Sequence, residues 1–70
     1  MKISVVDDYL NVAFTGFNDE HTFTITTPDG HSCIVNGEPV DTVSFTIVGD
    51  AELQNFCKAV RQISRIALDD

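Results

Sequence analysis

The last third of the chain has a helical pattern of apolar residues. They recur three or four positions apart, which places them on one stripe of a helix. The stripe consists of Leu53, Phe56, Cys57, Val60, Ile63 and Ala67. Basic residues on the opposite side are Lys58, Arg61 and Arg65. Asp50 is of a type favoured at a helix N-cap, and Glu52 adds an acid where the helix dipole favours one. The pattern predicts one amphipathic helix over about residues 51–68, capped by Asp50.

Two upstream segments alternate between apolar and polar residues with period two. Their apolar positions are Phe23, Ile25, Val43, Phe45 and Ile47. Threonine and serine occupy the positions between them, at Thr22, Thr24, Thr26, Thr42, Ser44 and Thr46. Aromatic and β-branched residues at this spacing are typical of half-buried strands with one apolar and one polar face.

Turn signals separate these strands. The Pro-Asp-Gly at 28–30 favours a tight turn, and the Asn-Gly at 36–37 is typical of a type I′ hairpin. The short strand between them, 31–35, is expected to pair with both neighbours. This predicts a three-stranded meander over about 21–48, in which Pro39 makes residues 38–41 an edge or a bulge.

In the first twenty residues, the alternation of apolar positions shifts by one residue. Apolar positions are odd at Ile3 and Val5 and even at Leu10, Val12 and Phe14. Since a one-residue slip turns every side chain to the other face, a turn or a bulge lies at residues 7–8. We favour two strands, 2–6 and 9–15, joined by a tight turn, over one long bulged strand. A further turn is expected at 16–20.

Together these elements predict a single small α+β domain spanning residues 1–70. It is an antiparallel β-meander of four to five strands, with one C-terminal helix packed on one face in a two-layer arrangement. The expected core joins Phe14, Phe23, Ile25, Cys33, Val35, Val43, Phe45 and Ile47 of the sheet to Leu53, Phe56, Val60 and Ile63 of the helix. The other face is polar and also carries Ser32.

The net charge and its distribution along the chain indicate which partners suit this protein. Eleven acidic and four basic residues give a net charge of −7, and no Lys or Arg lies between Ile3 and Cys57. A negative surface is unsuited to free nucleic acid or an anionic membrane, both of which attract basic proteins. No apolar run is long enough to cross a bilayer, and the first eight residues do not resemble a signal peptide, so a cytoplasmic protein is expected.

Residues that could support chemistry are few. Cys33 and Cys57 are interpreted as two free thiols on the core side, with a disulfide as the alternative in an oxidising compartment. Together with His21 and His31 they could bind zinc, but they lack the two close ligand pairs of structural zinc sites. No serine lies in a nucleophile elbow, and no glycine-rich phosphate loop is present. We therefore expect no enzyme activity, no cofactor and no metal.

Binding to another protein is the function that these features favour. The expected contact residues are acids in the predicted turns, namely Asp7, Asp8, Asp19, Glu20, Asp29, Glu38 and Asp41. One hypothesis is a stoichiometric inhibitor that blocks a basic, nucleic-acid-handling protein, with carboxylates in place of phosphates. By size and charge alone, this chain is comparable to phage and mobile-element inhibitors such as anti-CRISPR and DNA-mimic proteins.

Two other interpretations remain open. In the first, the protein is a structural or assembly subunit that forms homo-oligomers through its sheet face or an edge strand. The charge would then serve only solubility, for which a magnitude of this size is ordinary. In the second, the basic stripe of the helix orients a partner electrostatically rather than only complementing the helix dipole.

Overall fold

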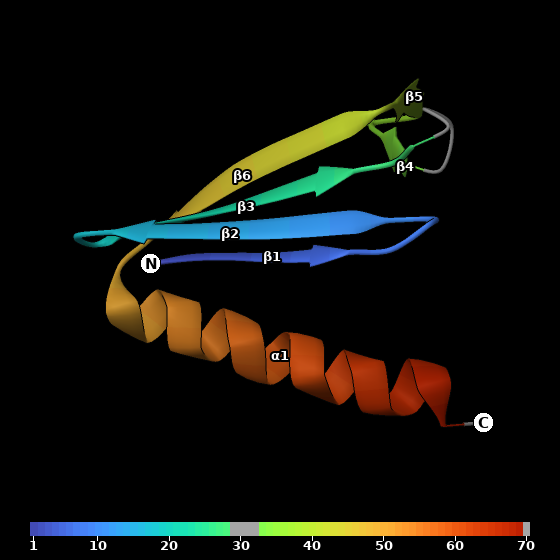
Figure 1. Ribbon diagram of the computed structural model, residues 1–70. Coiled ribbons are helices and arrows are strands. Elements are labelled where there is room, and N and C mark those ends of the chain that lie inside the picture. The colour runs from blue at the N-terminus through green and yellow to red at the C-terminus, as the bar shows by residue number, and fades with distance from the viewer. Residues whose placement is uncertain (29–32, 70) are drawn as a thin grey trace.

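The computed structural model describes residues 1–28 and 33–69. Its elements are β1 (Lys2–Val6), β2 (Asn11–Phe17), β3 (Glu20–Thr26), β4 (Cys33–Val35), β5 (Glu38–Val40), β6 (Thr42–Val48) and α1 (Asp50–Leu68). Strands β1, β2, β3 and β6 form an antiparallel sheet in that order, and α1 runs along one face of it (Figure 1). The predicted α+β fold with one C-terminal helix is confirmed. Of the described residues, none belongs to a helix apolar enough to span a membrane.

Strand register sorts the side chains onto two faces as the alternation predicts. Phe14 lies opposite Phe23, and Phe23 lies opposite Phe45, so the three rings share the face that α1 covers. On the other face, the hydroxyls of Thr22 and Thr46 are 2.9 Å apart and hydrogen-bonded. Thr24 and Ser44 form an equivalent bond at 3.2 Å. The polar face is therefore held together by cross-strand hydroxyl pairs.

The first two strands are separate, as favoured from the sequence, and the single bulged strand is wrong. The backbone N–H of Asp7 donates to Oδ1 of Asn11, and the N–H of Tyr9 donates to Oδ1 of Asp7. These bonds hold residues 7–10 in the turn, so β2 begins at Asn11 rather than Tyr9. β2 also continues through Gly16 to Phe17, and the following turn is tighter than predicted, with Asn18 at φ 56°.

Strand β4 does not join the main sheet, contrary to the prediction. β6 pairs with β3 along its whole length, from Glu20 opposite Val48 to Thr26 opposite Thr42. A seven-residue strand with paired hydroxyls competes better for this edge than a three-residue strand. Within the described residues β4 pairs with β5 instead, across the predicted Asn-Gly turn, whose two residues both have positive φ. The proposed turn at 28–30 falls partly outside the described residues.

The start of the helix also differs from the prediction. Gly49, not Asp50, is the N-cap residue, and no side chain caps the helix. Gly49 has φ 112° and ψ 140°, a conformation accessible almost only to glycine, and a Cβ there would collide with the carboxylate of Glu52. Its N–H donates to the carbonyl of Asp19 at 2.7 Å. This bond fixes the sharp passage from β6 into α1.

Aromatic rings hold the helix to the sheet. The Phe56 ring centroid is 5.2 Å from that of Phe23 and 5.7 Å from that of Phe45. Phe23 also contacts Phe14 at 5.0 Å and Phe45 at 5.4 Å. Such tilted and offset pairs stabilise a fold beyond the area that they bury. The core is therefore a cluster of four phenylalanines at the first half of the helix.

The second half of the helix is more exposed than predicted. Leu53 and Phe56 are half-buried, whereas Val60 and Ile63 are exposed, although all four lie on one stripe. Beyond the rings, the helix side of the sheet carries Val5, Val12 and Val43. Cys57 is likewise exposed, contrary to expectation, while Cys33 is half-buried, and both are free thiols as favoured. Among the described residues no hydrophobic side chain is fully buried.

Candidate functional site

The predicted contact acids lie at two opposite ends of the sheet (Figure 1). We call the end with the β1–β2 turn and the β4–β5 hairpin the hairpin end. Its acids are Asp7, Asp8, Glu38 and Asp41. We call the end with the β2–β3 turn and the start of α1 the helix-start end. Its acids are Asp19, Glu20, Asp50 and Glu52. The remaining predicted residue, Asp29, is outside the described residues.

Backbone and side-chain bonds bring the acids of the hairpin end together. Asn11 receives the bond from Asp7 and lies opposite Thr26 in the β2–β3 register. The next residue, Thr27, donates its N–H to the carbonyl of Asp41 at 2.9 Å. The β1–β2 turn and the residue before β6, Asp41, are thus connected through the start of β2 and the end of β3. Acids 34 positions apart in the sequence, at 7 and 41, therefore share one end of the molecule.

These carboxylates are not neutralised by basic side chains. In the described part of the chain, no Asp or Glu oxygen is within 4.0 Å of a Lys or Arg nitrogen. The acids of the hairpin end are exposed to solvent. Three of the four basic residues lie instead on α1. Carboxylates without a cationic partner are available to bind one from another molecule.

An exposed aromatic residue adjoins each pair of acids in the turns. Tyr9 is 81% exposed and directly follows Asp7 and Asp8. Phe17 is 74% exposed and closes β2 just before the turn that contains Asp19. Aromatic residues are enriched at the centres of protein interfaces, where they act as anchors. The sequence interpretation missed both, although an aromatic residue beside an acidic turn was a visible signal.

At the helix-start end, one acid takes part in holding the fold together, through a hydrogen bond with His21. His21 is buried, its ring stacks on Phe14 with 6.0 Å between centroids, and its Nε2 is 3.0 Å from Oδ1 of Asp50. An ionised carboxylate only accepts hydrogen bonds, so Nε2 carries the proton and donates it. The other ring nitrogen, Nδ1, is buried and has no partner among the described residues. Asp50 therefore links the helix to β3 across the Gly49 bend.

This link can be measured by replacing Asp50 in two ways. Asp50→Ala leaves the buried Nε2–H of His21 without an acceptor, whereas Asp50→Asn keeps an acceptor oxygen. Both variants lose the same charge next to the helix N-terminus, so the dipole effect cancels. We expect Asp50→Ala to be less stable than Asp50→Asn by about 1–2 kcal/mol in urea unfolding. Equal stabilities would show that the bond contributes nothing.

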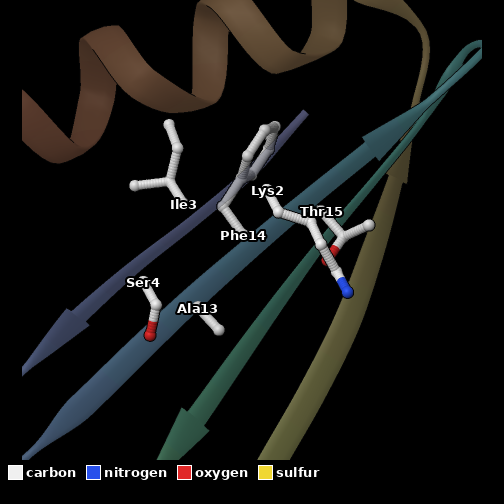
Figure 2. Close-up of a pocket in the computed structure, with 6 residues that line it drawn as sticks. All are labelled: Lys2, Ile3, Ser4, Ala13, Phe14 and Thr15. Atoms are coloured by element: carbon white, nitrogen blue, oxygen red, sulfur yellow. The ribbon is translucent and has the colours of Figure 1, made fainter.

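The described residues offer little for catalysis or metal binding. Residues 1–28 and 33–69 contain no group of three or more His, Cys, Asp or Glu side chains placed to hold a metal. Of the four His and Cys residues considered for zinc, His31 lies outside these ranges. A recess of about 300 Å³ over β1 and β2 is lined by Lys2, Ile3, Ser4, Ala13, Phe14 and Thr15. Ile3 and Phe14 point to the helix side, and Ser4 and Lys2 point away (Figure 2). This lining places no acid beside a base or nucleophile.

The exposed acids, with their neighbouring aromatic residues, are therefore the described features best suited to recognition. They lie in the turns, strand ends and helix start at the two ends of a paired sheet. The hairpin end gathers four acids, and the helix-start end gathers four more. Comparison with protein-family models, with curated proteins and with solved structures finds no match to this chain.

Proposed function

We propose that this protein is a non-enzymatic interaction module that binds the basic, nucleic-acid-binding surface of a larger protein and blocks it. The observation that carries the proposal is the hairpin end. There, Asp7, Asp8, Glu38 and Asp41 share one end of the sheet with an exposed Tyr9, and none of the four carboxylates is paired with Lys or Arg in the described residues.

Carboxylates suit such a target because they resemble phosphates to an arginine or lysine. The guanidinium fork of arginine binds either group through two parallel hydrogen bonds. A groove that binds a nucleic acid backbone therefore also attracts a cluster of acids. Tyr9 adds a ring that can stack on a guanidinium or occupy a base-stacking position. The net charge of −7 would also speed the encounter with a basic surface.

The hairpin end is favoured over the helix-start end because, among the described residues, none of its carboxylates is bound to another side chain. The one internal bond is the backbone N–H of Tyr9 donating to Oδ1 of Asp7. At the helix-start end, Asp50 is engaged by His21, and both Asp50 and Glu52 complement the helix dipole. Positive charge is also present there: the N-terminal ammonium of Met1 donates to the Gly16 carbonyl, and Lys2 lies opposite Thr15. The positive charges of these two groups offset part of the negative charge of that end.

Two triple variants test the proposal with the same change in charge. Asp7→Asn, Asp8→Asn and Glu38→Gln neutralise the hairpin end, and Asp19→Asn, Glu20→Gln and Glu52→Gln neutralise the helix-start end. Each triple changes the net charge from −7 to −4. The immobilised wild-type chain and both variants are incubated with a nuclease-treated cell extract. Retained proteins are identified by mass spectrometry and eluted with rising salt.

We expect the wild type and the helix-start variant to retain the same basic, nucleic-acid-binding protein and the hairpin-end variant to lose it. With the purified target, the hairpin-end variant should bind at least about tenfold more weakly. The wild type should also displace a nucleic acid fragment from that target. Equal retention by all three chains, or a target that keeps its nucleic acid, would contradict the proposal.

A further inference from the structure

An apolar surface lies open between the second half of α1 and the edge of the sheet. Ile63 is 64% exposed, although it lies on the same stripe as Phe56, which contacts the sheet. On the sheet, Ile3 is 52% exposed and points to the helix side together with Phe14 (Figure 2). Val5 and Val60 are exposed in the same region. We call Ile3, Val5, Val60 and Ile63 the apolar wedge.

The whole chain exposes more surface than a folded monomer of this size normally does. A folded monomer of 7.7 kDa is expected to expose about 4,300 Å², from the usual scaling of surface with mass. This chain exposes 5683 Å². The difference, about 1,400 Å², exceeds the roughly 800 Å² that each partner buries in a standard protein interface. The chain as a whole therefore exposes enough surface for a stable interface, and the apolar wedge is part of that surface.

We propose that the apolar wedge is covered by a second copy of this chain, in a pair with two-fold symmetry. In such a pair the second half of one α1 packs against Ile3 and Val5 of the other copy, and the reverse contact follows from symmetry. Each copy supplies both halves of the interface, a helix stripe and a sheet edge, and all four wedge side chains are uncharged. Pairing would bury these side chains, whereas the described residues of a single chain contain no fully buried hydrophobic side chain.

Charge along the helix also fits a pair in which the two helices run antiparallel. The first turn of α1 carries Asp50 and Glu52, and the last turn carries Arg65. An antiparallel arrangement brings the acidic first turn of one copy towards the second half of the other helix. The three basic residues there, Lys58, Arg61 and Arg65, outnumber the two acids that follow, Asp69 and Asp70, and the arrangement opposes the helix dipoles favourably. None of the acids of the hairpin end belongs to the apolar wedge, although Val5 lies only two residues before Asp7. The inference does not rest on the proposed function.

The mass in solution is the first test. Analytical ultracentrifugation of the purified full chain should give 15.4 kDa, twice the chain mass of 7.7 kDa, over a range of concentrations. The melting temperature should rise with protein concentration, because unfolding separates the two copies. A mass of 7.7 kDa at every concentration would overturn the proposal, as would an open-ended series of larger masses.

Two lysine substitutions then locate the interface. Ile63 and Val48 are both 64% exposed, but Val48 is on the opposite face, beside Glu20 in the register. Each substitution lowers the magnitude of the net charge, so neither adds repulsion between copies. Ile63→Lys should raise the dissociation constant of the pair at least about a hundredfold, since it affects two buried sites. Val48→Lys should change it by no more than about threefold. Equal effects, or the reverse order, would overturn the proposal.

Discussion

Phe23→Ala is expected to be among the most destabilising single substitutions in this protein, at about 3–4 kcal/mol, the lower part of the full-burial range because Phe23 is half-buried. Phe23 is in the central part of the sheet, and its ring contacts those of Phe14, Phe45 and Phe56. Truncation removes three aromatic pairs at once and leaves a cavity under the helix. A 70-residue domain has a total stability of roughly 4–10 kcal/mol, so the variant should be largely or partly unfolded at 37 °C.

Phe17→Ala is the matched control for this prediction. It removes the same side chain from a ring that is mostly exposed and lies on the other face of the sheet. We expect it to cost less than about 0.5 kcal/mol. Urea unfolding followed by circular dichroism at one fixed protein concentration compares the two variants. Similar losses for Phe23→Ala and Phe17→Ala would show that the four-ring cluster is not the centre of the core.

The faces and the main strands could be predicted because they depend on local pattern. Threonine alternates with Phe23 and Ile25 over residues 22–26, and the pleat of a strand places the threonines on one face and the apolar residues on the other. The Asn-Gly turn at 36–37 was likewise predictable, since few dipeptides accept two positive φ angles. In each case the determinant lies within a few residues of the feature.

Features that depend on competition between distant segments could not be predicted in the same way. The edge of β3 could accept β4 or β6, and only the three-dimensional pairing shows that β6 occupies it. Asp50 had two possible roles, a cap for its own helix and a partner for His21, 29 positions away. The Gly49 bend makes the second role available, because it turns the first helical residue towards β3.

The same distinction applies to the candidate site. The sequence identified the acids correctly as residues without nearby basic partners, because the absence of Lys and Arg from residues 3–57 is a property of the chain itself. It could not divide them into the hairpin end and the helix-start end, since that division follows from strand order. It also placed Val60 and Ile63 in the core, because a stripe pattern shows which side of a helix is apolar and not how closely that side is covered.

Phe56→Ala is expected to release the helix while the sheet remains paired. Phe56 provides the ring contacts between α1 and the sheet, at 5.2 Å to Phe23 and 5.7 Å to Phe45. Because Phe56 is half-buried, we expect a loss of about 2–4 kcal/mol, at the lower side of full-burial values. A helix of 19 residues without tertiary contacts is only marginally stable in water, so a released α1 would fray.

Amide hydrogen exchange separates this local release from global unfolding. In Phe56→Ala, the amides of α1 should exchange at least about tenfold faster than in the wild type, while those of β2 and β3 change less. Ile66→Ala is the control, because Ile66 is on the same helix and is mostly exposed.

A second comparison measures the exchange of both variants at protein concentrations well below and well above the dissociation constant of the pair. If a second copy covers the apolar wedge, high concentration should restore part of the protection in Phe56→Ala, because Val60 and Ile63 would still be held by the partner. Protection that is lost equally at both concentrations would mean that Phe56 and its ring cluster alone hold the helix.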